Sequence, residues 1–219
     1  MKYFFWDVDG TLVDTKEGVL NAYRYTFDKL GKPTPPDSVL MQGIGPATEY
    51  GFEHIMNLDR NTAKTAFEYF CEYYGEKGIL ESTPYRGAEE ALALVKELGY
   101  NNYIASMKKE EHCATLLKAR GWDRYIDGLY GENPAKGFTE KTAELACGMA
   151  ETGADGRDAV IIGDKASDIA AGKKTGIWTA AALYGYGGRE ELVPAKADVY
   201  IETGEDLAQF IKRFAEGMV

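Results

Sequence analysis

The chain has 219 residues, of which 45% are hydrophobic and 27% are charged, as in an ordinary soluble globular protein. It carries 35 Asp and Glu against 25 Lys and Arg, and the net charge of −10 argues against nucleic-acid and membrane-surface partners, which need clustered positive charge. A phosphate-bearing ligand remains compatible, provided that a cation, a lysine or backbone amides make its site locally positive.

The first residues and the cysteines predict a soluble, cytoplasmic protein. The chain begins with an apolar run, but Asp7 and Asp9 interrupt it far too early for a signal peptide or a membrane span. The three cysteines are widely spaced and odd in number, which fits a reducing cytosol better than a disulfide framework.

The first predicted strand, Tyr3–Val8, ends in a pair of carboxylates. Residues i and i+2 of a strand point to the same side, so we expect Asp7 and Asp9 to project together at the carboxyl end, where open parallel sheets bind ligands. Such a pair repels unless a cation or a shared proton relieves it. Gly10 permits the sharp turn that follows. If this motif stood alone, a plain strand end with an Asp-Gly turn would be the better explanation.

Helical patterns without a convincing strand follow, from about residue 15 to residue 83. They predict helices over Lys16–Leu30, Ala47–Met56 and Thr62–Gly75, with a turn-rich stretch at residues 32–37. An insertion of this size after the first strand predicts a small second domain. We place it at residues 15–82, inside a core domain of residues 1–14 and 83–219.

From residue 88 onward, helical patterns alternate with short apolar runs. The runs predict strands at Asn102–Ser106, Gly128–Tyr130, Ala159–Gly163 and Trp178–Leu183, with Asp198–Ile201 as a weaker candidate. The helical patterns cover Ala88–Leu98, Glu110–Arg120 and Thr139–Ala150, and a glycine closely follows each. This alternation predicts an α/β fold, with a Rossmann-like parallel sheet covered by helices on both faces.

A second pair of carboxylates follows the predicted strand Ala159–Gly163. Asp164 comes directly after it, and Asp168 lies four residues later at the start of a helix. An aspartate at the position of Asp168, taken alone, is more often a helix cap than a metal ligand. Four carboxylates delivered by two strands to one sheet edge predict a site for a hard cation, with Mg²⁺ as the natural occupant.

Two further polar residues fall at matching places. Ser106 ends a predicted strand, and Lys141 lies at the start of the helix that precedes Ala159–Gly163. A turn serine and a surface lysine would explain each of them singly.

The ordered set resembles the haloacid dehalogenase superfamily of Asp-nucleophile phosphatases over nearly the whole chain. The set is Asp7-x-Asp9-Gly10-Thr11 at the first strand, Ser106 at the second, a downstream lysine, and Gly163-Asp164-x-x-x-Asp168. Further stretches resemble the phosphoglycolate phosphatase-like branch: Gly43-Ile44-Gly45-Pro46, Pro84-Tyr85-Arg86-Gly87, Ser106-Met107-Lys108 and Leu183-Tyr184-Gly185-Tyr186-Gly187. The resemblance implies that residues 15–82 form a helical cap and that the activity is hydrolysis of a phosphomonoester.

The resemblance also implies catalytic and metal-binding roles. Asp7 would be the nucleophile that forms an aspartyl-phosphate, and Asp9 the general acid and then the general base. Mg²⁺ would be held by the Asp7 carboxylate, the Asp9 backbone carbonyl and Asp164. Asp168 would be a nearby ligand or would orient the others.

The phosphate-binding residues implied by the resemblance are Gly10, Ser106, Met107 and Lys141, which would hold the oxygens of the transferring phosphoryl group. The lysine has a competitor, because Lys136 lies only five residues earlier. We favour Lys141, since apolar residues follow it at four and eight residues as in the helix of the family.

Asp9 and the histidines discriminate between alternative functions. Dehalogenases of the superfamily lack an acid at the position of Asp9, because a halide leaving group needs no proton, so Asp9 favours ester hydrolysis. Phosphosugar mutases carry a cap histidine soon after the first motif, whereas the histidines here are His54 and His112, both expected at the surface. A phosphoaspartate signalling receiver would lack the helical insertion, and a non-catalytic relative would lack some of the catalytic residues.

The expected substrate is a small phosphorylated metabolite with phosphoglycolate first, and nucleoside monophosphates or sugar phosphates as alternatives. The cap sets this choice in the branch, and its candidate contacts are Lys16, Tyr23, Arg24, Gln42 and Thr48. We expect a monomer or a homodimer, with no nucleic-acid or membrane partner.

Overall fold

The computed structural model describes residues 1–44, 48–138 and 140–218, and the chain divides into two compact units. The first unit combines Met1–Asp14 with Pro84–Val219, and the second unit is Thr15–Thr83. Among the helices in the described ranges, none combines the length and the apolar character that crossing a membrane requires.

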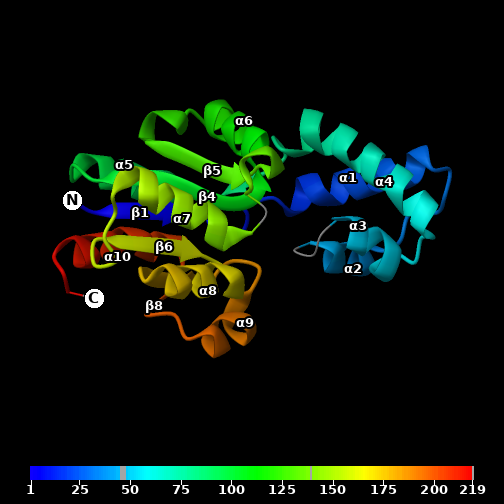
Figure 1. The fold of residues 1–219 in the computed structure, drawn as a ribbon. Coiled ribbons are helices and arrows are strands. Elements are labelled where there is room, and N and C mark those ends of the chain that lie inside the picture. The colour runs from blue at the N-terminus through cyan, green and yellow to red at the C-terminus, as the bar shows by residue number, and fades with distance from the viewer. Residues whose placement is uncertain (45–47, 139, 219) are drawn as a thin grey trace. The chain divides into compact units, whose positions relative to one another are not determined.

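A six-stranded parallel sheet forms the centre of the first unit, in the order β5-β4-β1-β6-β7-β8 (Figure 1). Its strands are β1 (Tyr3–Trp6), β4 (Asn101–Lys109), β5 (Gly128–Glu132), β6 (Ala159–Gly163), β7 (Trp178–Ala182) and β8 (Val199–Ile201). Trp6 at the end of β1 lies opposite Ile104 of β4 and Ile162 of β6. The carboxyl end of β1 therefore opens at the middle of the sheet edge.

Six helices pack around this sheet: α5 (Ala88–Glu97), α6 (Glu110–Arg120), α7 (Lys141–Thr152), α8 (Ala166–Thr175), α9 (Gly188–Ala195) and α10 (Leu207–Ala215). Three short 3-10 turns connect elements: η4 (Asp123–Tyr125), η5 (Pro134–Lys136) and η6 (Gly204–Asp206). Two short strands, β2 (Val13–Asp14) and β3 (Thr83–Pro84), form a separate two-stranded sheet.

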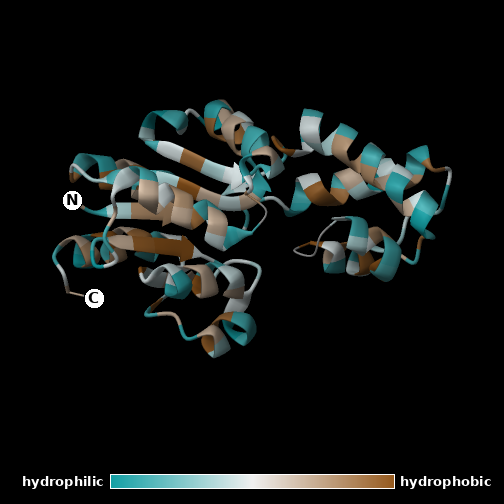
Figure 2. Cartoon of the chain, in the orientation of Figure 1, coloured by the Kyte–Doolittle hydropathy of each residue, from teal (hydrophilic) through white to brown (hydrophobic). Residues whose placement is uncertain are grey.

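Adjacent residues of β1 show that the sheet is covered on both faces. Phe5 packs in one cluster with Leu145 of α7 and Ala171 of α8. The ring of Phe4 instead meets the ring of Phe214 in α10, edge to face at 5.4 Å. Neighbouring strand residues point to opposite faces, so α7 and α8 cover one face and α10 the other. The strand β6 is buried throughout and hydrophobic along its length (Figure 2), as a doubly covered strand must be. The predicted fold class is confirmed.

The second unit is helical. It contains α1 (Lys16–Lys29), α2 (Asp37–Leu40), α3 (Thr48–Tyr50) and α4 (Arg60–Tyr73), with the 3-10 turn η1 (Met41–Gly43) and the π-helical turns η2 (Gly51–Ile55) and η3 (Tyr74–Gly78). Helix α1 packs along α4, and Tyr23 of α1 is buried between Phe52, at 5.3 Å, and Phe70, at 5.0 Å between ring centroids. The Tyr23 hydroxyl donates to the Gly43 carbonyl at 2.9 Å, so its polar end is satisfied inside this unit.

Several predicted boundaries differ from the observed ones for local reasons. Strand β1 ends at Trp6 rather than Val8, because the Val8 carbonyl accepts from the Leu12 and Val13 amides and the chain is already turning there. Residue Ala47 of the predicted helix Ala47–Met56, residues Gly45 and Pro46 of the quoted motif, and Thr139 lie outside the described residues. The described part of that predicted helix is a short α-turn followed by the π-helical η2.

One predicted surface residue is largely buried. The His112 side chain is only 15% exposed, against 58% for His54. Burial, together with Lys108 and Lys109, lowers the pKa of His112 to about 4. The prediction of a surface position is therefore wrong for His112 and confirmed for His54.

Candidate active site

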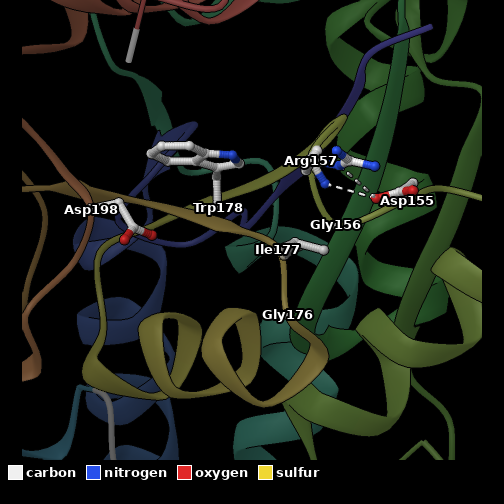
Figure 3. A pocket seen from close by; sticks show the side chains of 7 residues that line it. All are labelled: Asp155, Gly156, Arg157, Gly176, Ile177, Trp178 and Asp198. Atoms are coloured by element: carbon white, nitrogen blue, oxygen red, sulfur yellow. Dashed lines mark hydrogen bonds and ion pairs between the residues drawn. The ribbon is translucent and has the colours of Figure 1, made fainter.

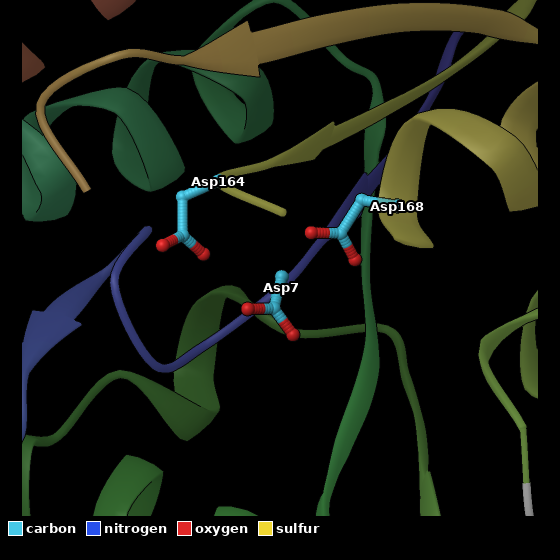
Figure 4. A group of neighbouring side chains, drawn as sticks. All are labelled: Asp7, Asp164 and Asp168. Carbon is cyan, nitrogen blue, oxygen red and sulfur yellow. The ribbon is translucent and has the colours of Figure 1, made fainter. Parts of the chain in front are cut away.

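Three aspartates meet at the carboxyl edge of the sheet. Asp7 follows β1, Asp164 follows β6, and Asp168 lies in the first turn of α8. All three are buried, and one carboxylate oxygen of each lies within 4.8 Å of the others (Figure 4). Burial, followed by the charges of Asp7 and Asp168, raises the pKa of Asp164. The three carboxylates therefore repel one another, and a bound cation would reduce this repulsion.

The donor set of this cluster fits Mg²⁺. Carboxylate oxygens are the ligands that this ion prefers, and it commonly uses one or two of them together with substrate phosphates. Asp164 is also held in place, since its Oδ2 accepts from the Tyr186 amide at 2.7 Å and its Oδ1 accepts from the Thr11 hydroxyl at 3.5 Å. A fixed carboxylate loses little freedom when it binds an ion.

Lys141 reaches the same cluster from the start of α7. Its Nζ donates to Asp7 Oδ1 at 2.5 Å and to the Ala105 carbonyl at 2.9 Å, and it lies 2.8 Å from Asp168 Oδ1. These three acceptors match the three N–H donors of an ammonium group in number. Burial alone would lower the pKa of Lys141, but the Asp168 and Asp7 charges outweigh it and raise the pKa. The lysine is therefore a charged member of the cluster.

Lys136, the competing lysine, lies elsewhere. Its Nζ pairs with Glu110 Oε1 at 2.7 Å, and its side chain is about half exposed. Of the two candidates, the structure brings Lys141 to Asp7.

Asp9 forms a separate ion pair on the same edge. Lys108 Nζ donates to Asp9 Oδ1 at 3.0 Å and to Oδ2 at 3.1 Å. The lysine side chain is 3% exposed and the Asp9 side chain 33%. The Asp9 carboxylate is therefore not in the three-aspartate cluster, and its expected contribution to a metal through the backbone carbonyl stays a prediction.

The predicted phosphate-binding residues lie around the end of β4 and the turn after β1. Ser106 is buried, and its Oγ accepts from the Lys108 amide at 3.2 Å. Gly10 has φ +85°, and a Cβ there would lie 2.2 Å from Asp164 Oδ2, so this turn requires glycine. The Met107 side chain is exposed and has no N–H or O–H group, so only its backbone amide is a candidate for binding phosphate.

The segment after β7 closes over Asp164. A Cβ on Gly185 would lie 2.3 Å from Asp164 Cβ and 2.4 Å from the Gly10 carbonyl oxygen. The Tyr184 hydroxyl donates to the Thr11 carbonyl at 2.9 Å. This segment is one of the stretches that resemble the branch, and its contacts with Asp164 follow only from the fold.

Glu144 is a buried carboxyl that no sequence motif indicates. It follows Lys141 by one helical turn, is fully buried, and neither of its side-chain oxygens has a hydrogen-bond partner among the described residues. Burial raises the pKa of Glu144 to about 7, although Lys141 opposes this shift. A glutamate in an amphipathic helix carries no sequence signal for such a position.

One pocket lies at the opposite edge of the sheet. Its lining residues are Asp155, Gly156, Arg157, Gly176, Ile177, Trp178 and Asp198 (Figure 3). They precede or begin β6, β7 and β8, whereas the aspartate cluster follows the carboxyl ends of strands. The carboxylate of Asp198 is also occupied, since it accepts from the amide and the hydroxyl of Thr179. This pocket therefore takes no part in the candidate active site.

The candidate substrate contacts of the second unit differ in accessibility. Tyr23 is wrong as a candidate, because it is buried in the core of that unit. Arg24 forms a bidentate pair with the Asp37 carboxylate at 2.8 Å, and Gln42 is exposed. Lys16 and Thr48 are partly exposed and stay candidates.

The chain is similar to known proteins over most of its length. A family model described as haloacid dehalogenase-like hydrolase matches residues 4–182. A 5'-nucleotidase from Pseudomonas aeruginosa is 25% identical over 187 residues, covering 85% of each chain. A phosphoglycolate phosphatase from Aquifex aeolicus is 29% identical over 193 residues, covering 85% of this chain and 86% of the relative. Among solved structures, a haloacid dehalogenase-like family protein from Streptococcus pneumoniae superposes with a TM-score of 0.87 at 26% identity, covering 96% of this chain and 98% of the other.

Proposed function

The chain belongs to the haloacid dehalogenase-like hydrolases, and we propose that it is a phosphatase that hydrolyses a small phosphomonoester through an aspartyl-phosphate on Asp7. The observation that carries the proposal is the convergence of Asp7, Asp164, Asp168 and Lys141 at one sheet edge. Phosphoryl transfer requires a positioned nucleophile and compensation of charge, and this arrangement offers both. The names of the two relatives, a phosphoglycolate phosphatase and a 5'-nucleotidase, support the same class of reaction.

In the proposed reaction, a carboxylate oxygen of Asp7 attacks phosphorus while the bond from phosphorus to the leaving oxygen breaks. Asp9 donates a proton to that oxygen, and the alcohol departs. Asp9 then accepts a proton from water, whose oxygen attacks the phosphorus of the aspartyl-phosphate. The bond to Asp7 breaks, which releases inorganic phosphate and restores both carboxyl groups.

The other residues of the site would compensate and orient charge. Asp7 and Asp164 would hold Mg²⁺ together with the Asp9 carbonyl, and Asp168 would orient them or bind as well; the ion, when bound, supplies positive charge beside the transferring phosphoryl group. Lys141, which already neutralises Asp7, would share its donors with phosphoryl oxygens. Ser106 and backbone amides near Gly10 would bind the remaining oxygens.

We assign the second unit as the cap that selects the substrate. A phosphoglycolate-like ester is the leading candidate, supported by the branch motifs and by the relative from Aquifex aeolicus. A nucleoside monophosphate is the second candidate, because another relative is a 5'-nucleotidase. A monomeric or homodimeric state and a cytoplasmic location stay predictions.

The test is release of inorganic phosphate from a panel of small phosphomonoesters, with Mg²⁺ or with a chelator. We expect Mg²⁺-dependent release that falls by more than about a thousandfold in Asp7→Asn, because the nucleophile is then missing. Trapping of a phosphoryl group on Asp7 during turnover would identify the intermediate. Undiminished release by Asp7→Asn would contradict the proposal.

A further inference from the structure

We propose that Tyr186 is a positioning residue, which couples the binding of a cation at Asp164 to the order of the junction between the two units. The inference rests on the proposed function, because it takes Asp164 as a ligand of Mg²⁺. It goes beyond that function by giving the chain after β7 a second task. Changes at the aspartate cluster are transmitted to β2, the strand from which the chain enters the second unit.

Tyr186 holds one aspartate at each of its two ends. Its amide donates to Asp164 Oδ2 at 2.7 Å, and its hydroxyl donates to Asp14 Oδ1 at 3.0 Å. Asp164 is fully buried at the carboxyl end of β6, whereas Asp14 ends β2 and is the last residue before the second unit. Since one residue with a rigid ring carries both donors, a displacement of Asp164 also displaces the donor that Asp14 accepts from.

Two glycines press this segment against Asp164. A Cβ on Gly187 would lie 2.2 Å from the Asp164 carbonyl oxygen, and a Cβ on Gly185 would collide with the Asp164 side chain. The backbone on either side of Tyr186 is therefore packed directly on Asp164, with no gap in which either could shift alone. A cation that fixes the Asp164 carboxylate consequently fixes the Tyr186 amide.

Further contacts of the same segment reach both sides of the junction. The Tyr184 hydroxyl donates to the Thr11 carbonyl at 2.9 Å, shortly before β2. The Tyr184 ring also packs edge to face on the ring of Tyr85, at 4.9 Å between centroids, directly after the chain returns to the first unit at Pro84. Strand β2 pairs with β3, so the outgoing and the returning connection lie together. The segment that contains Tyr186 thus holds the chain where it leaves the first unit and where it returns.

A cation should change the order of this junction. Repulsion among the three buried carboxylates opposes a fixed position of Asp164, and a bound cation reduces that repulsion. Amides at the junction exchange with solvent through local opening, whose frequency depends on the contacts that hold β2. Binding of Mg²⁺ therefore slows exchange there. Because coupling between two sites is reciprocal, loosening the junction weakens Mg²⁺ binding by the same factor.

The test is hydrogen exchange in peptides that cover residues 12–16 and 82–86, with saturating Mg²⁺ and with a chelator. For the parent protein we expect Mg²⁺ to slow this exchange by at least about threefold, a part of the roughly tenfold that one hydrogen bond to a charged group is worth. In Tyr186→Phe, which lacks only the hydroxyl, the slowing should disappear, while saturating Mg²⁺ still raises the thermal midpoint. Tyr200→Phe removes the hydroxyl of an exposed tyrosine in β8 and should behave like the parent.

The other outcomes separate this inference from the proposed function. If Tyr186→Phe keeps the full effect of Mg²⁺ on exchange, the hydroxyl does not transmit it and the proposal is overturned. If Tyr186→Phe does not fold, Asp14→Ala removes the acceptor of the same hydrogen bond, and an undiminished effect there overturns the proposal equally.

The parent protein alone also decides. If Mg²⁺ raises its thermal midpoint and supports phosphate release but leaves exchange at the junction unchanged, this inference fails and the proposed function stands. If Mg²⁺ neither binds nor supports phosphate release, both fail.

Discussion

The Lys141 ammonium lies 2.5 Å from Asp7 Oδ1, although 134 residues separate the two in the chain. The contact links the start of α7 to the turn that follows β1. The charge of the proposed nucleophile is thus balanced by a residue that would also bind the phosphoryl group. Stability and turnover should therefore both depend on Lys141.

Substituting Lys141 with methionine should impair both properties. The change leaves the buried Asp7 and Asp168 carboxylates without their cation, which should lower the free energy of unfolding by about 3–5 kcal/mol. Phosphate release should fall by more than about a hundredfold. The control is Lys136→Met: its exposed pair with Glu110 is worth at most about 1 kcal/mol, so turnover should stay unchanged. Urea unfolding and phosphate release measure the two effects, and loss of turnover in Lys136→Met alone would reverse the assignment.

Mg²⁺ should stabilise the folded protein through the aspartate cluster. A ligand that binds only the folded state, at about 100 times its Kd, adds about 2.7 kcal/mol to the free energy of unfolding. We expect the thermal midpoint to rise with Mg²⁺ and to return when a chelator is added. In Asp164→Asn the rise should be absent, because a buried carboxylate of the cluster is missing. Asp155→Asn changes an exposed aspartate at the other edge of the sheet and should respond like the parent. An equal rise in Asp164→Asn would rule out this cluster as the site.

Glu144 should make stability depend on pH. Its pKa is raised from 4.5 to about 7, so between these values the folded protein keeps a proton that the unfolded chain has released. The contribution of Glu144 to the free energy of unfolding is therefore at its most favourable below about pH 4.5, and it is lost as the pH rises through about 7. Glu144→Gln does not titrate, so its free energy of unfolding relative to the parent should rise by about 1–3 kcal/mol between pH 5 and pH 8.

Urea unfolding of both proteins at the two pH values tests this expectation. The exposed Glu97→Gln serves as the control and should differ from the parent equally at both. If Glu144→Gln also showed a pH-independent difference, Glu144 would not titrate in this range.

Gly185→Ala should impair turnover more than it lowers the stability of the fold. The added Cβ would lie 2.3 Å from Asp164 Cβ, which must move to make room. We expect turnover to fall by more than about tenfold and the thermal shift with Mg²⁺ to shrink. Gly137→Ala is the matched control: its positive φ makes alanine cost about 1 kcal/mol, but no neighbouring atom of the described residues lies within 4 Å of the new Cβ. Normal turnover in Gly185→Ala would show that this close approach does not position Asp164.

The sequence predicted best what local patterns determine. Strand β6 and helix α6 match their predicted bounds, because a continuous apolar run identifies the former and Gly121, with φ +67°, ends the latter. Helix α10 was not predicted, although Leu207, Phe210 and Phe214 carry a helical spacing. The π-helical turn η2 has no signature in the local pattern, and its residue Phe52 packs against Tyr23 of α1.

The same distinction holds at the site. Motif order located Asp7, Asp164, Asp168 and Lys141, which the structure brings together, while their roles stay predictions. The contact of Lys108 with Asp9 could not be predicted from the motif, because the inward position of Lys108 depends on the pairing of β4 with β5. Burial of Glu144 likewise results from the packing of α7 on the sheet and has no signature in the helix itself.

The central position of β1 has a consequence for biosynthesis. Tyr3 pairs with Asn101 on one side and with Ala159 on the other, so both neighbours of this strand are translated long after it. Translation adds about 5–20 residues per second, so about 8–30 s pass between synthesis of the apolar segment Phe4-Phe5-Trp6 and synthesis of β6, its second neighbour in the sheet. The second unit, Thr15–Thr83, is fully translated well before then, and we expect its local contacts to let it fold first. The strand that precedes Asp7 is thus the segment that a ribosome-associated chaperone would shield longest.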